Sequence, residues 1–329
     1  MGGEKWELGN FHYFPLSKLV PRNAGSEIPL ALHSRYSGII FMLLAALGFS
    51  TMGGAAKLLK DGFNAGQLVF YRNLIGLVFL GVSLWYHPVR QEGGKTGWLV
   101  FRGFMGTVAL YTLLFCILHM PLGTAMTYNL TSAIFIAIFS YLVFREYHGA
   151  GVLLALLLGF LGMLMIYKPA MDLPLGWHLA GLLSGVSSAI AYMTVGRLAR
   201  FYDPRIIVLS FLLSGVLLPV LSMMIHYLSG IPEDGLFLVS FRLPSGMEWA
   251  YILLLGLAAL FGQYFVTRAY GADKAGIVSA ISYANIVFSV LLGMALGDPF
   301  PDGWSLAGMA CIICSGVLIG FRKRRRAAP

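Results

Sequence analysis

Two clusters of uncharged polar residues interrupt apolar stretches of this 329-residue chain, one within residues 111–146 and one within 264–300. The members are Tyr128, Asn129 and Ser132 in the first cluster and Ser282, Tyr283 and Asn285 in the second. Hydroxyl and amide groups inside an apolar span need hydrogen-bonding partners, which come from a neighbouring helix or from a cavity. Because two similar clusters recur in the chain, we interpret them as parts of one solute-binding cavity.

Arg72 is the most costly residue in the apolar stretches, because it lies several residues inside a predicted span over 65–86. A guanidinium group at that depth needs an anionic partner, a water-filled cavity or the nearby headgroups. We predict that Arg72 binds an anionic group of a solute, such as a carboxylate. Contact with the outer headgroups or with a backbone carbonyl stays open as the alternative.

Further polar and aromatic residues lie at mid-span positions and are candidates for the same cavity. They are Tyr111, Gln263 and Tyr264 and, after them, Lys57, Thr51 and Tyr192. The tryptophans, in contrast, mostly fall at the ends of predicted spans, as in the aromatic belts of membrane proteins. The mid-span tyrosines are therefore the aromatic residues that we assign to a binding site.

The sequence carries no pattern for hydrolytic or metal chemistry. HExxH and GxSxG motifs are absent, and the seven histidines are scattered along the chain. Cys116, Cys311 and Cys314 all lie in apolar runs, where we expect buried packing. We predict a protein that is not an enzyme and needs no cofactor. An intramembrane enzyme and a membrane assembly factor remain as alternatives.

Composition places the chain in a membrane. Hydrophobic residues make up 58% of it, charged residues 11%, and the mean hydropathy is +0.78. With about 20 residues per span, about ten helices fit. The expected spans lie near 35–59, 65–86, 97–118, 122–144, 149–168, 177–199, 204–228, 248–271, 275–297 and 303–321. The predicted fold class is an all-α integral membrane protein with ten transmembrane helices.

The basic residues follow the loops on alternate sides of these spans. With the N-terminus in the cytoplasm, most of the 23 lysines and arginines fall on the cytoplasmic side, in a set that includes Arg102. The other side keeps Lys57, Lys60, Arg72, Lys168 and Arg242. This asymmetry predicts an inner-membrane protein with both termini cytoplasmic. It also accounts for the net charge of +9 without a nucleic-acid partner.

Five spans in each half suggest an internal duplication. We predict five-helix repeats over residues 35–168 and 177–321, flanked by a cytoplasmic tail over 1–34 and a basic tail over 322–329. An odd number of crossings inverts the second repeat relative to the first. Inverted repeats with a central site suit alternating access, because two equivalent halves can exchange inward- and outward-open shapes.

Two small-residue motifs predict close helix contact. They are Gly181-xxx-Gly185 and Gly316-xxx-Gly320. Glycines at this spacing let helices approach closely in lipid. We expect packing within the bundle, and a homodimer seam is the alternative use of the same motifs.

Several local patterns resemble the drug/metabolite transporter superfamily, in its ten-helix EamA branch. The matching features are Lys57 in AAKLL, Phe70-Tyr71-Arg72, the Leu-Val-Phe-Arg-Gly run at 99–103, Glu146 after the fourth span, Ala272-Asp273-Lys274-Ala275 and Ser282-Tyr283-Ala284-Asn285. Gly297-Asp298-Pro299 departs from the family, which usually has a glycine–glutamate pair there. The resemblance covers about residues 36–321.

This resemblance implies a transporter of a small solute in membrane lipid, because members of the branch carry amino acids, S-adenosylmethionine, riboflavin or purines. Within that range we favour an amino acid or amino-acid derivative, since Arg72 could hold a carboxylate. A nucleoside- or cofactor-like solute, such as S-adenosylmethionine, is the alternative. The absence of carboxylates from the centres of the predicted spans favours a facilitator over a proton-coupled carrier.

Overall fold

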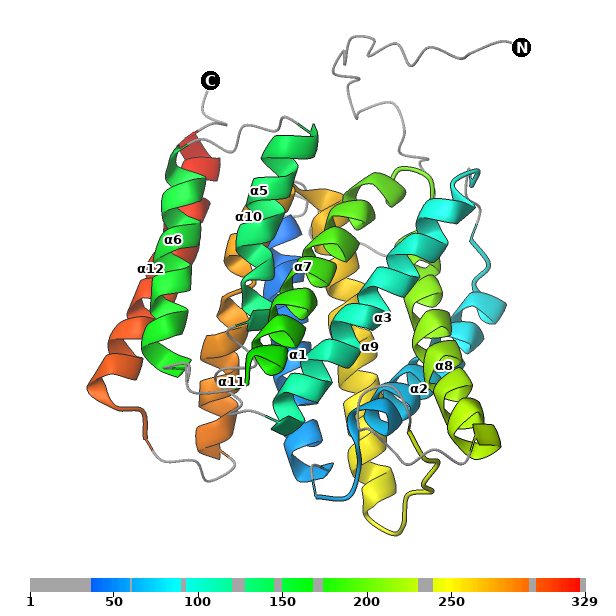
Figure 1. Cartoon of the computed structure of the whole chain (residues 1–329). Helices are drawn as coiled ribbons and strands as arrows, with labels where there is room; N and C mark the ends of the chain where they lie inside the picture. Colours follow the sequence, from blue (N-terminus) through cyan, green and yellow to red (C-terminus); the bar gives the residue numbers. More distant parts are fainter. Residues whose placement is uncertain are drawn as a thin grey trace. The chain divides into compact units, whose positions relative to one another are not determined.

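The computed structural model describes residues 37–59, 61–89, 93–119, 128–144, 150–167, 174–229, 239–295 and 300–325. Regular structure in these ranges is helical (Figure 1). The helices are α1 (Ser37–Leu59), α2 (Ala65–Tyr86), α3 (Thr96–His119), α5 (Ser132–Phe144), α6 (Ala150–Tyr167), α7 (Leu175–Leu198), α8 (Pro204–Ser229), α9 (Glu248–Ala272), α10 (Ala275–Ile281), α11 (Ala284–Ala295) and α12 (Gly303–Arg325). Residues 128–130 are also helical and lead into α5.

The lengths of these helices match a bilayer. Within the described ranges, seven segments are long and apolar enough to cross it, and one of them, Ala275–Leu292, runs from α10 into α11. Three shorter apolar helices are Tyr128–Phe139, Ala150–Ile166 and Gly303–Leu318. Helices suit lipid because they satisfy their own backbone hydrogen bonds. The prediction of an all-α integral membrane protein is confirmed.

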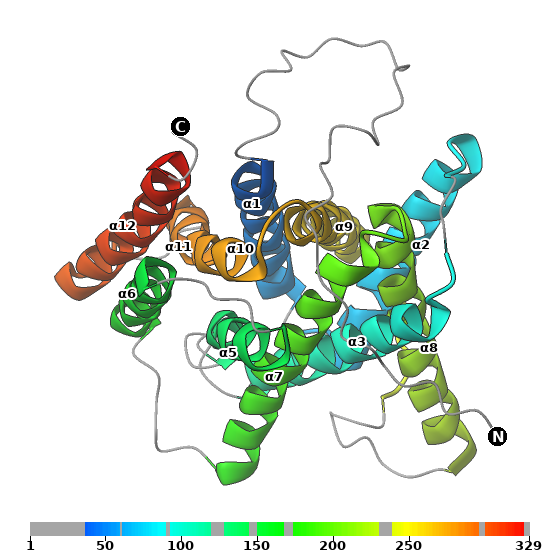
Figure 2. The ribbon, with the colours of Figure 1, turned by 90° about the horizontal axis from the view of Figure 1, so that it is seen from above.

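The helices form two groups around a central set, as Figures 1 and 2 show from two directions. At one edge α6 packs against α12, and at the other edge α2, α3 and α8 pack against one another. Between them lie α1, α7 and α9, where α1 packs on α9 and α7 on α3. The second edge group carries the buried charges described below.

The packed pairs follow the order of helices in the two halves. When α1, α2 and α3 are exchanged with α7, α8 and α9, the pair α1–α9 becomes α7–α3. The pair α2–α9 likewise becomes α8–α3, and the pair α2–α3 becomes α8–α9. All six of these helix pairs are in contact in the structure. The division into inverted repeats over 35–168 and 177–321 stays a prediction, which this exchange of contacts supports.

Local hydrogen bonds fix where two of the edge helices begin. At the start of α2, the Asn64 side chain accepts a bond from the Gln67 N–H at 2.9 Å, and the Gln67 side chain accepts one from the Asn64 N–H at 3.0 Å. Before α8, Asp203 accepts a bond from the Arg205 N–H at 2.8 Å. Such caps satisfy amide groups that a helix start leaves unpaired. They set the register of the residues two turns further on.

Glycines bring several helices into close contact. A Cβ at Gly181 would lie 2.5 Å from the ring of Tyr128, and one at Gly185 would lie 2.5 Å from the Thr131 hydroxyl. This first motif therefore packs α7 inside the bundle, as expected. A Cβ at Gly316 would lie 3.7 Å from Cδ1 of Ile281, which is ordinary van der Waals contact. A homodimer stays a prediction.

One packing expectation is wrong. Cys116 is buried, but Cys311 is half-buried and Cys314 is exposed on the surface of α12. Sequence hydropathy cannot tell the lipid-facing side of an apolar helix from its packed side, because both are apolar.

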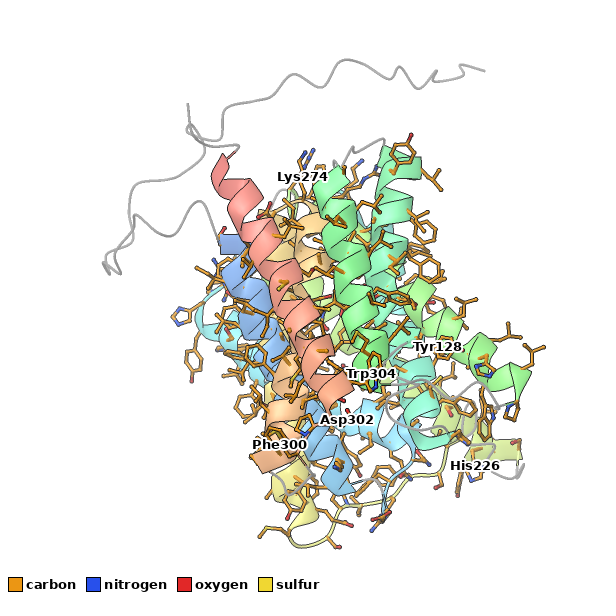
Figure 3. The ribbon with its side chains drawn as sticks, turned by 90° about the vertical axis from the view of Figure 1, so that its left-hand side faces the viewer. Tyr128, His226, Lys274, Phe300, Asp302 and Trp304 are labelled. Carbon is orange, nitrogen blue, oxygen red and sulfur yellow. The ribbon has the colours of Figure 1, made fainter. Side chains whose placement is uncertain are left out.

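The ends of the bundle separate residues that the charge pattern assigns to opposite sides. Figure 3 shows Lys274 at one end, and Asp302, Trp304 and Phe300 toward the other. The sidedness itself stays a prediction. Glu146, Asp298, Lys60 and Lys168 lie outside the described residues, as does the predicted tail over 1–34.

Candidate functional site

Arg72 lies in the interior of the α2–α3–α8 group. Its side chain is buried, with 5% of the residue exposed. In the part of the chain that the structure describes, Nε and Nη1 of Arg72 have no hydrogen-bonding partner. Its Cζ lies over the ring of Phe211 of α8, 5.5 Å from the ring centroid. Among the described groups, this buried cation therefore lies against an aromatic face and keeps unused hydrogen-bond donors.

Arg102 of α3 lies on the same ring. The residue is 1% exposed, and its Cζ is 4.9 Å from the Phe211 centroid. Among the described residues, Nε and Nη1 of Arg102 are also without partners. The sequence pattern counted Arg102 with the cytoplasmic loops, but the structure buries it in α3. Two uncompensated guanidinium groups therefore meet at Phe211.

Glycines on α3 make this arrangement possible. A Cβ at Gly103 would lie 2.5 Å from the backbone oxygen of Ser210, so α3 and α8 are nearly in backbone contact. A Cβ at Gly106 would lie 2.8 Å from the Phe211 ring and 3.1 Å from Nη1 of Arg102. Gly106 thus leaves the space in which the ring and the guanidinium group meet.

A tyrosine pair borders the two arginines. Tyr192 of α7 and Tyr270 of α9 stack with their centroids 5.0 Å apart and their planes at 15°. Tyr192 interacts electrostatically with both Arg72 and Arg102, and the two arginines also act on each other. The site therefore combines two cations, the ring of Phe211 and a tyrosine close enough to interact electrostatically with both cations.

No described carboxylate pairs with either arginine. The ion pairs recorded among the described residues join Arg205 to Asp203 at 3.3 Å and Arg242 to Glu248 at 2.8 Å. Neither pair includes Arg72 or Arg102. In low dielectric an unpaired charge is costly. The arrangement can therefore bind an anion chemically, because it supplies charge and donors that the described protein groups leave unused.

Asn285 forms hydrogen bonds between helices. Its Nδ2 donates to the backbone oxygen of Ala46 in α1 at 3.1 Å, and the backbone oxygen of Asn285 accepts from the Ser50 hydroxyl at 3.0 Å. The Ser289 hydroxyl donates to Ser50 at 3.1 Å and to Asn285 Oδ1 at 3.4 Å. These bonds tie α11 to α1.

Asn129 forms a similar connection in the first half. Its Nδ2 donates to the hydroxyls of Ser184 and Ser188 of α7, both at 3.3 Å. Ser184 in turn donates to the Ala109 oxygen of α3 at 3.0 Å. Ala46 and Ser50 are four residues apart in α1, as Ser184 and Ser188 are in α7. Both asparagines thus connect helices, and contact with solute stays a prediction for each.

The remaining members of the two polar clusters lie among packed helices. The Tyr128 hydroxyl bonds Nδ1 of His178 at 2.5 Å. Tyr283 is 0% exposed, its ring faces Gly159, and its hydroxyl has no partner in the described ranges. Ser282 donates within its own turn to Ser279 at 2.6 Å. Ser132 is buried at the start of α5. The structure does not bring these residues onto Phe211 with the arginines.

The other predicted residues lie elsewhere in α3 and α9. The Tyr111 hydroxyl is near Ser222 of α8 and would lie 3.0 Å from a Cβ at Gly66. Gln263 is 4% exposed, and its Nε2 has no partner among described residues. Tyr264 lies beside Arg268, whose Cζ is 5.7 Å from its ring centroid. Gln263 therefore resembles the two arginines in having a buried hydrogen-bond donor without a partner among the described residues.

Three of the predicted residues of lower rank also have defined places. Tyr192 borders the arginines, as described above. The Thr51 hydroxyl donates to the Leu47 oxygen of its own helix at 3.0 Å. Lys57 lies in the last turn of α1. Of these, only Tyr192 joins the charged site.

Sequence reasoning missed Arg102 and Phe211. Arg102 lies six residues inside α3, and that depth resembles the position of Arg72 in α2. The depth was the available signal, together with the glycines at 103 and 106 that make space beside it. Phe211 gave no signal, because phenylalanine is common on every face of a membrane helix.

A second arginine cluster lies where α9 begins, and we call Gly62, Phe63, Arg242, Ser245 and Glu248 the Arg242 cluster. Arg242 donates to the Gly62 oxygen and to Glu248, and its Cζ is 4.6 Å from the Phe63 centroid. Ser245 donates to Glu248 through its N–H at 2.8 Å. A cavity of about 360 Å³ borders this cluster between Leu59 and Tyr251. Its cation is already paired within the protein.

Known proteins resemble the chain over most of its length. Residues 36–168 match the EamA-like transporter family. An uncharacterized transporter of Helicobacter pylori (strain J99) is 32% identical over 289 residues, which cover 86% of this chain and 94% of that one. The pseudopaline exporter CntI of Pseudomonas aeruginosa (strain UCBPP-PA14) is 29% identical over 290 residues, which cover 88% of this chain and 97% of that one. A protein of known crystal structure, 20% identical, superposes with a TM-score of 0.72 over 88% of this chain and 100% of its own, which shows the shared fold.

The match to the H. pylori relative covers nearly all of that protein's length, and almost a third of the aligned residues are identical. The expected resemblance to the drug/metabolite transporter superfamily is confirmed. The chain belongs to the EamA-like transporter family of that superfamily, and it is a membrane transporter, not an enzyme.

Proposed function

We propose that the protein is a secondary transporter that moves a small metabolite with a free carboxylate, an amino acid or an amino-acid derivative. The observation that carries this proposal is the buried guanidinium group of Arg72, whose Nε and Nη1 have no partner among the described residues. A carboxylate neutralises such a charge and accepts its hydrogen bonds. The solute therefore supplies what the protein leaves out.

The supporting observations concern the route. The packed helix pairs exchange between the two halves, which is the arrangement expected for alternating access. The asparagine bonds join α11 to α1 and residues 128–130 to α7, so each connected pair can move as a unit. The basic loops favour the cytoplasmic inner membrane with both termini inside. A similar protein of P. aeruginosa is named as a pseudopaline exporter.

A nucleoside- or cofactor-like solute such as S-adenosylmethionine is the second candidate. The Tyr192–Tyr270 stack beside the arginines favours it, because an aromatic face can contact a base. S-adenosylmethionine also has a carboxylate for Arg72. Competition between labelled amino acids and unlabelled nucleosides separates the two candidates.

The test is saturable flux in proteoliposomes that contain the full chain. A thermal-shift screen of the detergent-purified protein against amino acids, nucleosides and cofactors first selects the solutes, because a ligand of the folded state raises its melting temperature. Flux of a carboxylate-bearing solute is expected, and Arg72→Gln should lower it about 30-fold or more, because a buried charge loses its partner.

The matched control is Arg205→Gln, which changes the same side chain in a half-buried ion pair with Asp203. This variant should transport at the wild-type rate. Equal flux through the wild type and Arg72→Gln, or flux only of solutes that lack a carboxylate, would contradict the proposed function.

A further inference from the structure

We propose that Arg72 and Arg102 form one two-cation site over the ring of Phe211, and that this site binds a solute with two carboxylates. The inference rests on the proposed transport function and narrows its solute class. It adds Arg102 and Phe211, which the sequence patterns did not single out, to the binding residues.

The charge of the site requires more than one anionic group. Arg72 and Arg102 are 5% and 1% exposed, and each has an unpartnered Nε and Nη1 in the described part of the chain. The two cations also repel each other. Coulomb energies rise as the dielectric constant falls, so a single carboxylate would leave one buried positive charge uncompensated. Two carboxylates neutralise the pair.

The geometry allows one small solute to touch both groups. The two Cζ atoms lie 5.5 Å and 4.9 Å from the same ring centroid, although they come from different helices. The helices α2, α3 and α8 that carry these residues pack pairwise. A short diacid can therefore reach from one guanidinium group to the other beside the Phe211 ring. Tyr192 lies close enough to interact electrostatically with both cations.

The cations are enclosed by protein, so the solute enters when helices part. Gly103 places α3 almost in backbone contact with α8, and Arg102 is on that face. Separation of α3 from α8 would open Arg102 first. A diacid that binds both arginines then draws α2 and α3 together, which links binding to the change of shape.

The experiment compares matched ligand pairs that differ in one charge. Binding of aspartate against asparagine, glutamate against glutamine, and succinate against succinamate is measured by thermal shift and by competition for flux, using the full chain. The wild type should prefer each diacid over its monoamide by about tenfold or more, because the lost hydrogen bonds are to a charged group. Inorganic phosphate and sulfate test a compact dianion.

The variants divide the preference between the two cations. Arg102→Gln should abolish the preference for the diacid, and Arg72→Gln should do the same. Arg102→Lys, which keeps the charge, should retain the preference with weaker binding. Arg205→Gln, which removes the ion pair with Asp203, serves as the control and should leave the preference intact. Folding of each variant is checked by its elution as a single species and by its unfolding transition.

The outcomes separate this inference from the proposed function. Equal handling of diacid and monoamide, with both lost in Arg72→Gln, overturns the two-cation site and leaves the proposed function standing. Binding of phosphate or sulfate but of no diacid overturns the dicarboxylate assignment. Flux of neutral or cationic solutes that neither arginine variant changes overturns both, as does the absence of flux for every anion in the panel. Loss of the diacid preference in both Gln variants supports the site.

Discussion

Two regions of this transporter place arginines over phenylalanine rings, yet the polar surroundings of the arginines are opposite. Arg72 and Arg102 share Phe211 in the interior, and each keeps an unpartnered Nε and Nη1 in the described structure. Arg242 lies over Phe63, and the Gly62 oxygen and Glu248 both accept its hydrogen bonds. The side chain of Arg242 is also 40% exposed.

The comparison teaches where the protein completes its own charge balance and where it does not. Burial makes an unpaired charge most costly in the interior, which is the place where partners are missing. At the Arg242 cluster, where water already lowers that cost, the partners are present. The interior pair therefore fits a binding site, and the Arg242 cluster fits a structural connection between the start of α9 and the α1–α2 turn.

The first way to break this comparison is to replace an interior arginine with an apolar residue of similar length. Arg72→Met or Arg102→Met should raise the free energy of unfolding of the ligand-free protein by about 1–4 kcal/mol, because a costly buried charge is removed. Transport should be lost at the same time. Thermal and chemical unfolding in detergent, in a buffer with chloride as its only small anion, measures the change. A fall in stability would show that the arginine already has a partner.

The second test acts on the space beside the ring. Gly106→Ala brings a Cβ to 2.8 Å from Phe211, and overpacking of this kind costs about 1–3 kcal/mol. Solute affinity should fall, because the ring and Arg102 are displaced together. Gly81→Ala in α2 is the matched control, since a Cβ there meets nothing within 4 Å. Equal affinities in the two variants would contradict the role of Gly106.

The third test removes the shared ring. Phe211→Leu keeps an apolar side chain but loses the cation–π contact, which is worth about 2 kcal/mol where the cation is desolvated. Solute affinity should therefore fall about 30-fold. The measurement is the concentration for half-maximal flux, with Phe63→Leu at the Arg242 cluster as the comparison. A loss confined to Phe63→Leu would reverse the roles of the two regions.

The smallest effect is expected at the Arg242 cluster. Arg242→Ala should lower the melting temperature by less than the methionine substitutions raise it, because its ion pair is partly exposed and screened. The difference from wild type should shrink in high salt. The preference between a diacid and its monoamide should not change. A lost preference would place Arg242 in solute binding after all.

Hydropathy predicted the helices well, because a span in lipid must be apolar and helical over a fixed length. The predicted 65–86 is α2, and the predicted 204–228 is α8 but for one residue. The site was harder. Arg72 was predicted from its depth, whereas Arg102 has a similar depth but was counted with the basic residues of the cytoplasmic side.

The asparagines show a different limit. Polar groups at 129 and 285 were expected to need partners, and each has them. Sequence does not say whether the partner is a solute or a neighbouring helix, because that depends on the rotation of each helix about its axis. Ser184 and Ser188 bond Asn129, and Ser50 bonds Asn285. Hydropathy does not show which side of an apolar helix an isolated serine lies on.

The unbalanced pair of cations has a consequence for the energy source of transport. If the arginines stay in the protein while a dicarboxylate without an amine crosses, two negative charges move through the membrane potential, whereas an amino diacid such as aspartate carries one net negative charge. Each charge is worth about 2.3 kcal/mol per 100 mV, so a dianion that leaves a cell with a negative interior gains about 4.6 kcal/mol at that voltage. Export would need no coupling ion, and uptake would be opposed by the same amount. Because no described carboxylate pairs with Arg72 or Arg102, the membrane potential alone would favour export of the dianion.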